Sequence, residues 1–176
     1  YKLENSGKVL VEGIAVGSKI GAGKVRVLDS AKNISSFQKG EVLVTEITDP
    51  DWEPIMKIAS AIVTDKGGRT SHAAIVSREL GIPCIVGSNN ATKVLKNGQD
   101  VTVDSSSGQV GRVYEGIIPF KVNEHRLDNI PKIDTKIMVN IGSPDDAFKS
   151  CRLPAQGVGL GRLELIIASH ERIQIG

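Results

Sequence analysis

Short apolar runs separated by turn residues recur along the first two thirds of the chain, and we interpret each run as a β-strand. These strands are expected at residues 8–16, 19–28, 41–47, 61–64, 84–86, 100–104 and 109–114. The first two runs flank Gly17-Ser18, and the last two flank a serine-rich turn at residues 105–108. The pattern therefore predicts one hairpin at each of these two places.

Between the strands in the middle of the chain, the spacing of apolar residues changes to a helical one. Helices are expected at residues 53–59, 71–80 and 91–96, and Gly81 and Pro83 end the second of them. A succession of strand, helix, strand, helix and strand predicts parallel pairing through crossovers. The sequence thus predicts an α/β domain with antiparallel hairpins at its two ends, which finishes near Ile118.

A different pattern follows this domain. Residues 119–135 contain two prolines and several charges without a clear period, so we interpret them as a linker. A strand is then expected at 136–141, a helix from Ser143 to about Arg152, and a second strand at 157–160. Some 40 residues cannot bury a core of their own, so residues 136–176 are expected to begin a second, larger domain.

Composition narrows the classes of function. Charged residues are 24% and hydrophobic residues 40% of the chain, as in ordinary globular proteins. A net charge of +2 and the lack of a basic stripe with interleaved aromatics argue against a nucleic-acid ligand. No apolar stretch approaches the roughly 20 residues that cross a bilayer. Cys84 and Cys151 match no metal spacing, and both are expected to be small apolar side chains. A chain with only these two cysteines is expected to be a reduced, cytoplasmic protein.

The most distinctive stretch of the sequence is the loop between the strand at 61–64 and the helix at 71–80. Gly67 and Gly68 carry no side chain, so the backbone can approach a bound group closely. Arg69 offers a charge-assisted contact to phosphate oxygens. The carboxyl end of a strand is also where open α/β sheets bind ligands. The loop therefore predicts an anion-binding site.

His72 falls in the first turn of the helix that follows this loop. Free N–H groups and the helix dipole favour an anion there, Thr70 is expected to cap the helix, and a partly neutral imidazole is a plausible nucleophile. A serine nucleophile, Ser71 activated by His72, is disfavoured because adjacent helical residues point about 100° apart. Metal binding is disfavoured too, since His125 and His170 lie in the linker and the tail and are expected on the surface.

The run TDPDWEPIMKIASAIVTDKGGRTSHAAIVSRELGIPCIVG (residues 48–87) closely resembles the phosphohistidine domain of the phosphoenolpyruvate synthase (pyruvate, water dikinase) family. Pyruvate, phosphate dikinase and enzyme I of the sugar phosphotransferase system share the GG-x-x-S/C-H-x-A core. Residues 135–167 resemble the start of the C-terminal (β/α)₈ barrel of the synthase, which binds phosphoenolpyruvate and pyruvate. Two departures are Cys84, where alanine is common, and the tail at 169–176, which differs from the expected barrel segment.

The resemblance implies a three-layer β/β/α swivelling phosphohistidine domain at residues 1–118, a linker at 119–135 and the beginning of the barrel at 136–176. His72 matches the phosphorylated histidine, for which the family implies Nε2, and Arg162 matches the barrel arginine that contacts the phosphate of phosphoenolpyruvate. Thr70 matches a threonine that a regulatory protein phosphorylates in some members. The loop residues that match are Gly67, Gly68, Arg69, Thr70 and Ser71.

The family reaction converts ATP, pyruvate and water to AMP, phosphoenolpyruvate and phosphate through a phosphohistidine. ATP and Mg²⁺ are expected on an ATP-grasp-type nucleotide domain outside this chain, so this segment is expected to bind no cofactor or metal and to be inactive alone. Alternatives are pyruvate, phosphate dikinase, a phosphotransferase-system enzyme I, or a non-catalytic module that retains the fold. Enzyme I would carry a helical carrier-docking subdomain, which this sequence does not show, and the intact His72 loop disfavours a non-catalytic module.

Overall fold

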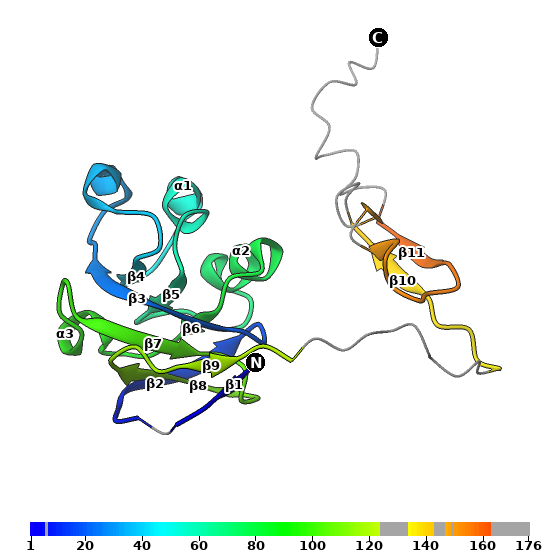
Figure 1. Ribbon diagram of the computed structural model, residues 1–176. Coiled ribbons are helices and arrows are strands. Elements are labelled where there is room, and N and C mark those ends of the chain that lie inside the picture. The colour runs from blue at the N-terminus through cyan, green and yellow to red at the C-terminus, as the bar shows by residue number, and fades with distance from the viewer. Residues whose placement is uncertain (6, 124–133, 143–146, 149, 163–176) are drawn as a thin grey trace, which may run out of the picture. The chain divides into compact units, whose positions relative to one another are not determined.

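The computed structural model describes residues 1–5, 7–123, 134–142, 147–148 and 150–162 (Figure 1). The chain divides into two compact units, Tyr1–Asn123 and Glu124–Gly176. The boundary lies five residues after the predicted end of the first domain. The predicted assignment of the second unit to a barrel is not tested by this division.

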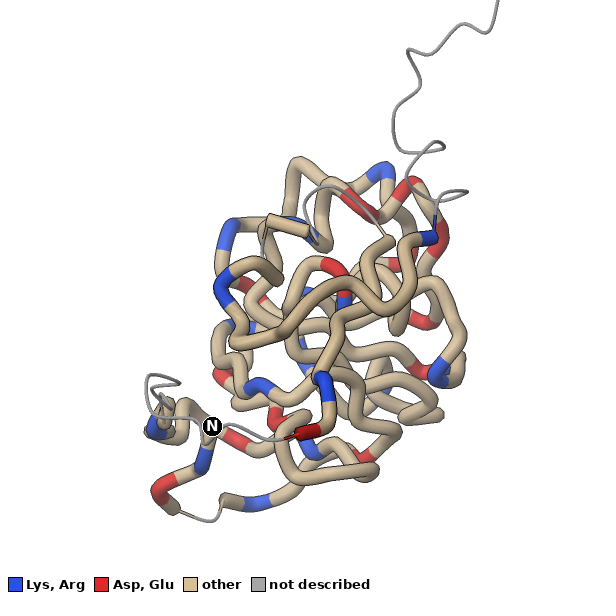
Figure 2. The backbone as a smooth tube through the Cα atoms, turned by 90° about the vertical axis from the view of Figure 1, so that its right-hand side faces the viewer, with Lys and Arg blue, Asp and Glu red and all other residues tan. Residues whose placement is uncertain are grey.

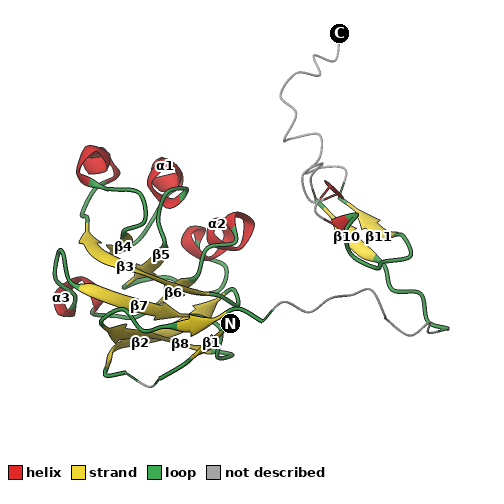
Figure 3. Ribbon diagram, in the orientation of Figure 1, coloured by secondary structure: helices red, strands yellow, loops and turns green. Residues whose placement is uncertain are grey.

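Seven strands of the first unit form a closed, barrel-like sheet (Figures 1 and 3). They are β2 (Val9–Val16), β3 (Ile20–Val27), β4 (Val42–Thr45), β5 (Ala61–Thr64), β6 (Cys84–Val86), β7 (Asp100–Asp104) and β8 (Val110–Glu115). The order around the barrel is β2-β6-β5-β4-β3-β7-β8. Neighbours from β3 to β6 run parallel, and the other neighbouring pairs are antiparallel. The predicted strands and the mixed α/β fold are therefore confirmed.

The hairpin predicted around Gly17-Ser18 is wrong, although both of its strands exist. β2 pairs with β6 and β8, whereas β3 pairs with β4 and β7. The second predicted hairpin, β7 with β8, does form, and it is inserted between β3 and β2. Alternation along a strand determines which side chains face inward, but it does not choose the neighbouring strand. Gly17, with φ of 88°, turns the chain out of β2 without pairing it to β3.

The helical elements are η1 (Ala31–Ser36), η2 (Pro50–Trp52), α1 (Glu53–Met56), α2 (His72–Leu80) and α3 (Ala91–Val94). α1 and α2 lie along the same side of the barrel (Figure 1). Leu43, Ile62 and Val86 pack with buried residues of α1 and α2, and the alternate residues of the same strands join a second apolar cluster with β2, β7 and β8. The central parallel strands are thus covered on both faces, which explains their nearly unbroken aliphatic sequence.

A two-stranded ribbon holds the ends of the first unit together. β1 (Lys2–Leu3) pairs antiparallel with β9 (Phe120–Lys121). The Nζ of Lys121 lies 3.0 Å from a carboxylate oxygen of Glu4, and the rings of Tyr1 and Phe120 have centroids 5.9 Å apart. Residues 120–121 therefore form a strand of the first unit within the range that the sequence predicts as a linker.

The described part of the second unit contains two parallel strands, β10 (Val139–Ile141) and β11 (Val158–Gly161). Both match predicted strands. The helix predicted from Ser143 to about Arg152 lies partly outside the described residues, and Ala147, Phe148 and Ser150 within it are helical. His125 and His170 lie outside the described residues.

Lysine and arginine are interspersed with aspartate and glutamate along the tube in Figure 2. A surface of mixed sign agrees with the small net charge of +2. Within the described ranges, no helix combines the length and the apolar character that crossing a membrane requires.

Candidate functional site

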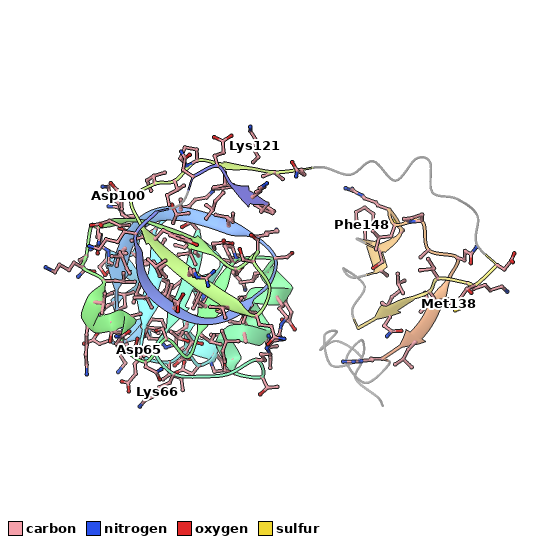
Figure 4. All side chains as sticks on the ribbon, turned by 90° about the horizontal axis from the view of Figure 1, so that it is seen from below. Asp65, Lys66, Asp100, Lys121, Met138 and Phe148 are labelled. Atoms are coloured by element: carbon pink, nitrogen blue, oxygen red, sulfur yellow. The ribbon has the colours of Figure 1, made fainter. Side chains whose placement is uncertain are left out.

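The predicted loop leaves the barrel at the carboxyl end of β5. The N–H of Asp65 donates to the carbonyl of Thr45 over 3.1 Å, and the N–H of Lys66 donates to the carbonyl of Glu46 over 2.8 Å. The parallel pairing of β5 with β4 therefore continues for two residues beyond the strands. In Figure 4, Asp65 and Lys66 lie on one side of the first unit and Lys121 of the terminal ribbon lies on the opposite side.

Asp65 fastens this loop to the loop that follows β6. Its carboxylate is nearly buried and accepts hydrogen bonds from the Ser88 hydroxyl at 3.2 Å, from the N–H of Thr92 at 3.1 Å and from the Thr92 hydroxyl. Its carbonyl accepts the N–H of Asn89 at 2.9 Å. Three donors offset the cost of burying this carboxylate. Asp65 thus holds the base of the site together rather than facing a ligand.

The two glycines of the loop differ in their physical role. Gly67 has φ of 111°, and a Cβ on it would lie 2.9 Å from the Ser71 hydroxyl oxygen, so a side chain does not fit there. A Cβ on Gly68 would meet nothing within 4 Å. Glycine at 68 thus leaves open space on the surface of the loop, where a bound group could approach the backbone.

The helix begins one residue later than a Thr70 cap would require, so the prediction that Thr70 caps the helix is wrong. Ser71 is the N-cap, with φ of −68° and ψ of 159°, and its side chain makes no capping bond. Its hydroxyl and its N–H instead both donate to the carbonyl of Gly68, over 2.8 and 3.0 Å. This tight turn fixes the start of the helix, and Thr70 stays exposed. The first-turn N–H groups keep their capacity to bind an anion.

His72 is the first residue of α2 and is partly buried. Its Nδ1 lies 3.0 Å from the hydroxyl oxygen of Thr48, a residue that is 5% exposed in the loop after β4. When Nδ1 carries the ring proton, it donates to this hydroxyl and leaves the lone pair on Nε2 free. The arrangement therefore suits a nucleophilic Nε2.

Sequence reasoning missed Thr48. A signal existed, because Thr48 follows β4 closely, and the carboxyl ends of neighbouring parallel strands meet at the same edge of a sheet. Using that signal required knowing that β4 lies beside β5.

The other candidate residues are placed as follows. Arg69 is exposed, and its carbonyl accepts a hydrogen bond from the Arg78 guanidinium. The Ser71 hydroxyl donates to Gly68 rather than contacting His72, which gives no support to a serine nucleophile. Arg162 is exposed directly after β11 in the second unit.

Two further classes of chemistry receive no support. Burial of Cys84 raises the pKa of its thiol to about 12, so this residue does not supply a thiolate nucleophile. Among the described residues, no three His, Cys, Asp or Glu side chains are grouped as a metal site would require.

Residues 37–108, which contain the whole loop and α2, match the family described as "PEP-utilising enzyme, mobile domain". The chain is 58% identical over 170 residues to the phosphoenolpyruvate synthase of Aquifex aeolicus, an alignment that covers 97% of this chain and 20% of that protein. It is 56% identical over 169 residues to the phosphoenolpyruvate synthase of Deinococcus radiodurans, covering 96% and 22% of the two chains. The predicted resemblance to the phosphoenolpyruvate synthase family is confirmed over nearly the whole of this chain.

The chain spans about a fifth of the length of these curated relatives. Among solved structures, it is similar to an Enzyme I protein whose solution structure was determined by NMR. The two share 34% identity at a TM-score of 0.39, and the match covers 49% of this chain and 33% of the other.

Proposed function

We propose that Nε2 of His72 accepts a phosphoryl group and carries it within a longer phosphoenolpyruvate synthase. The observation that carries this proposal is the 3.0 Å contact between Nδ1 and the Thr48 hydroxyl oxygen, which leaves the Nε2 lone pair free when Nδ1 carries the ring proton. High identity to phosphoenolpyruvate synthases over nearly the whole chain supports the same assignment.

In the proposed transfer, the Nε2 lone pair forms a bond to phosphorus while the bond from phosphorus to the donor oxygen breaks. The Nδ1–H group stays hydrogen-bonded to Thr48, and this hydrogen bond stabilises the positive charge that develops on the ring. In the second half-reaction the enolate oxygen of pyruvate attacks phosphorus, and the P–N bond breaks. Phosphoryl transfer depends mostly on positioning and charge stabilisation, and Arg69 with the amides of the loop would supply both.

The wider architecture belongs to the same proposal. A three-layer β/β/α arrangement of the first domain agrees with the two apolar clusters on opposite faces of β4 to β6. We propose that residues 136–176 begin the (β/α)₈ barrel, where Arg162 would contact phosphoenolpyruvate, and that residues 119–135 connect the two domains. ATP and Mg²⁺ would bind to an ATP-grasp-type domain elsewhere in the same cytoplasmic enzyme. Thr70, exposed two residues before His72, is accessible to a regulatory phosphorylation.

The test uses the full-length enzyme, with intact-mass analysis after incubation with ATP in the presence or absence of pyruvate. The wild type is expected to gain one acid-labile phosphoryl group without pyruvate and to lose it with pyruvate. His72→Ala is expected to gain none and to form no phosphoenolpyruvate. The 176-residue chain alone is expected to consume no ATP.

Lys121→Ala, a change on β9 on the opposite side of the first unit from Asp65 and Lys66 (Figure 4), is the matched control and should behave as the wild type. An acid-labile phosphoryl group on the His72→Ala enzyme would refute the carrier role. A requirement for inorganic phosphate instead of water would reassign the activity to a pyruvate, phosphate dikinase.

A further inference from the structure

Arg78 lies in the last turn of α2, yet its guanidinium contacts the loop in front of the helix. Its Nη2 donates to the carbonyl oxygen of Arg69, nine residues earlier. Helical side chains lean toward the N-terminus, which makes this reach possible. A basic residue in the last turn ordinarily interacts with the C-terminal carbonyls of its own helix. Arg78 therefore departs from the arrangement that helix stability alone would favour.

The C-terminus of α2 is already satisfied without Arg78. The N–H of Gly81 donates to the carbonyls of Arg78 and Ser77, so a backbone C-cap closes the last turn. Lys19 lies at the same end, with its Nζ 3.2 Å from where a Cβ on Gly81 would stand. A second cation at this end of the helix repels the Arg78 guanidinium. Both facts favour the contact of Arg78 with the loop.

The contact fixes the direction of one peptide plane. A trans peptide is planar, so the carbonyl of Arg69 and the N–H of Thr70 point in opposite directions. Holding the carbonyl against Arg78 turns the Thr70 N–H away from it. The preceding peptide is fixed in the same manner, because Ser71 holds the carbonyl of Gly68 and thereby orients the N–H of Arg69.

The N–H groups of Arg69 and Thr70 are thus each oriented by the carbonyl of the same peptide group. Neither N–H donates to another of the described residues. Adjacent backbone N–H groups in such a turn can form an anion-binding concavity. Arg69 and Thr70 are both exposed, and they precede Ser71, the N-cap of α2, which is followed by His72.

We propose that Arg78 is a positioning residue for phosphoryl transfer. It fixes the peptide between Arg69 and Thr70 so that two adjacent N–H groups bind the oxygens of a phosphoryl group on His72. This inference rests on the proposed function of His72. It assigns to Arg78 a role that acts through the backbone of the loop and requires no contact of Arg78 with the phosphoryl group.

The test compares variants of the full-length enzyme in a single turnover with radiolabelled ATP, and it measures both the rate of His72 phosphorylation and the lifetime of the phosphohistidine. Removing one preorganised donor from a transition state costs about 10²- to 10³-fold. Loss of a residue that orients such a donor should cost less, so Arg78→Gln is expected to slow phosphorylation about 10- to 100-fold. Arg78→Lys, which keeps a cationic donor, should recover part of the rate.

Two further arms separate positioning from folding. Arg112→Gln removes a partly buried arginine that bonds Glu12 of the neighbouring strand β2, and it should leave both measurements unchanged. Millimolar guanidinium chloride should restore part of the rate to Arg78→Ala and none to His72→Ala. The inference is overturned if Arg78→Gln matches Arg112→Gln, or if neither lysine nor guanidinium restores any rate. Failure of the wild type to form phosphohistidine would instead refute the proposed function itself.

Discussion

The central strands of the two units have similar sequences and very different surroundings. Every residue of β4, β5 and β6 is buried, whereas every residue of β11 is exposed and β10 is at most half-buried. Both sets are short, parallel and built mainly from aliphatic residues and glycine. An apolar pattern therefore indicates that a strand packs against other apolar residues. It does not indicate that those residues lie nearby in the sequence.

In the first unit, the parallel strands are covered on both faces. α1 and α2 pack on one face of the parallel strands, and side chains inside the barrel pack on the other. In the second unit, none of the described residues is buried. We attribute the difference to size, since a short segment cannot enclose a core, and we propose that further barrel strands of a longer enzyme cover β10 and β11.

The two cysteines give the largest contrast between the units. Cys84 in β6 is fully buried and burial raises its pKa to about 12, whereas Cys151 in the second unit is exposed. Near pH 8, a thiol with a pKa of about 12 is ionised roughly a thousandfold less than an ordinary one. In the native 176-residue chain, Cys84 should therefore react with a disulfide reagent at least about a thousandfold more slowly than an unperturbed thiol, whereas the exposed Cys151 should be labelled readily.

Peptide mapping of the labelled chain provides this measurement, and labelling in denaturant is the control in which both thiols react. Rapid native labelling of Cys84 would contradict the buried position of β6. In the full-length enzyme, slower labelling of Cys151 would support the proposed cover over the second unit, and unchanged labelling would argue against it.

The parts of the site that could be read from the sequence are those that depend on neighbouring residues. The strand before the loop, Gly67 and the position of His72 at the start of a helix all follow from local preferences. Thr48 required knowledge of which strands are neighbours. The N-cap moved from Thr70 to Ser71 because of a turn that closes on Gly68, and such a one-residue shift is beyond what capping preferences can resolve.

The same distinction, between features set by neighbouring residues and features set by distant ones, explains which parts of the fold could be predicted. The hairpin of β7 with β8 was predictable because its partners are joined by a short turn. The false hairpin of β2 with β3 has an even shorter turn, but β2 pairs with β6 and β8 and β3 pairs with β4 and β7. Partner choice is a property of the closed sheet, so it is not contained in either strand.

Truncation of a buried side chain in the first unit should destabilise the protein far more than truncation of an exposed side chain in the second unit. Ile62 in β5 is fully buried, whereas Leu160 in β11 is 53% exposed. Ile62→Ala should lower the free energy of unfolding of the first unit by about 2–5 kcal/mol, through lost burial and the cavity left behind. Leu160→Ala should change it by less than about 0.5 kcal/mol. Urea denaturation of the 176-residue chain measures both, and equal losses for the two variants would contradict the assigned burial.

The smallest of the three effects concerns an ion pair that the first unit also buries. Glu41 is 6% exposed, and its carboxylate accepts two hydrogen bonds from the Nε of Arg26, one from its Nη2 and one from the N–H of Gln38. Burial raises the pKa of Glu41, but the hydrogen bonds from Arg26 and Gln38 and the charge of Arg26 together outweigh it, so the pKa is lowered from 4.5. A lowered folded-state pKa stabilises the fold above the unfolded value and loses this contribution as the pH falls through the folded value.

Arg26→Gln should therefore leave a buried carboxylate without its counterion. We expect a loss of about 2 kcal/mol near pH 7, less than for a fully buried pair because the Arg26 side chain is 28% exposed. The difference from the wild type should narrow as the pH falls below 4.5, because protonation of Glu41 removes its unpaired charge. Lys24→Gln breaks an exposed pair with Asp100 and should cost less than about 0.5 kcal/mol at either pH. A loss for Arg26→Gln that stays constant across this pH range would show that the guanidinium stabilises the barrel by packing rather than through its charge.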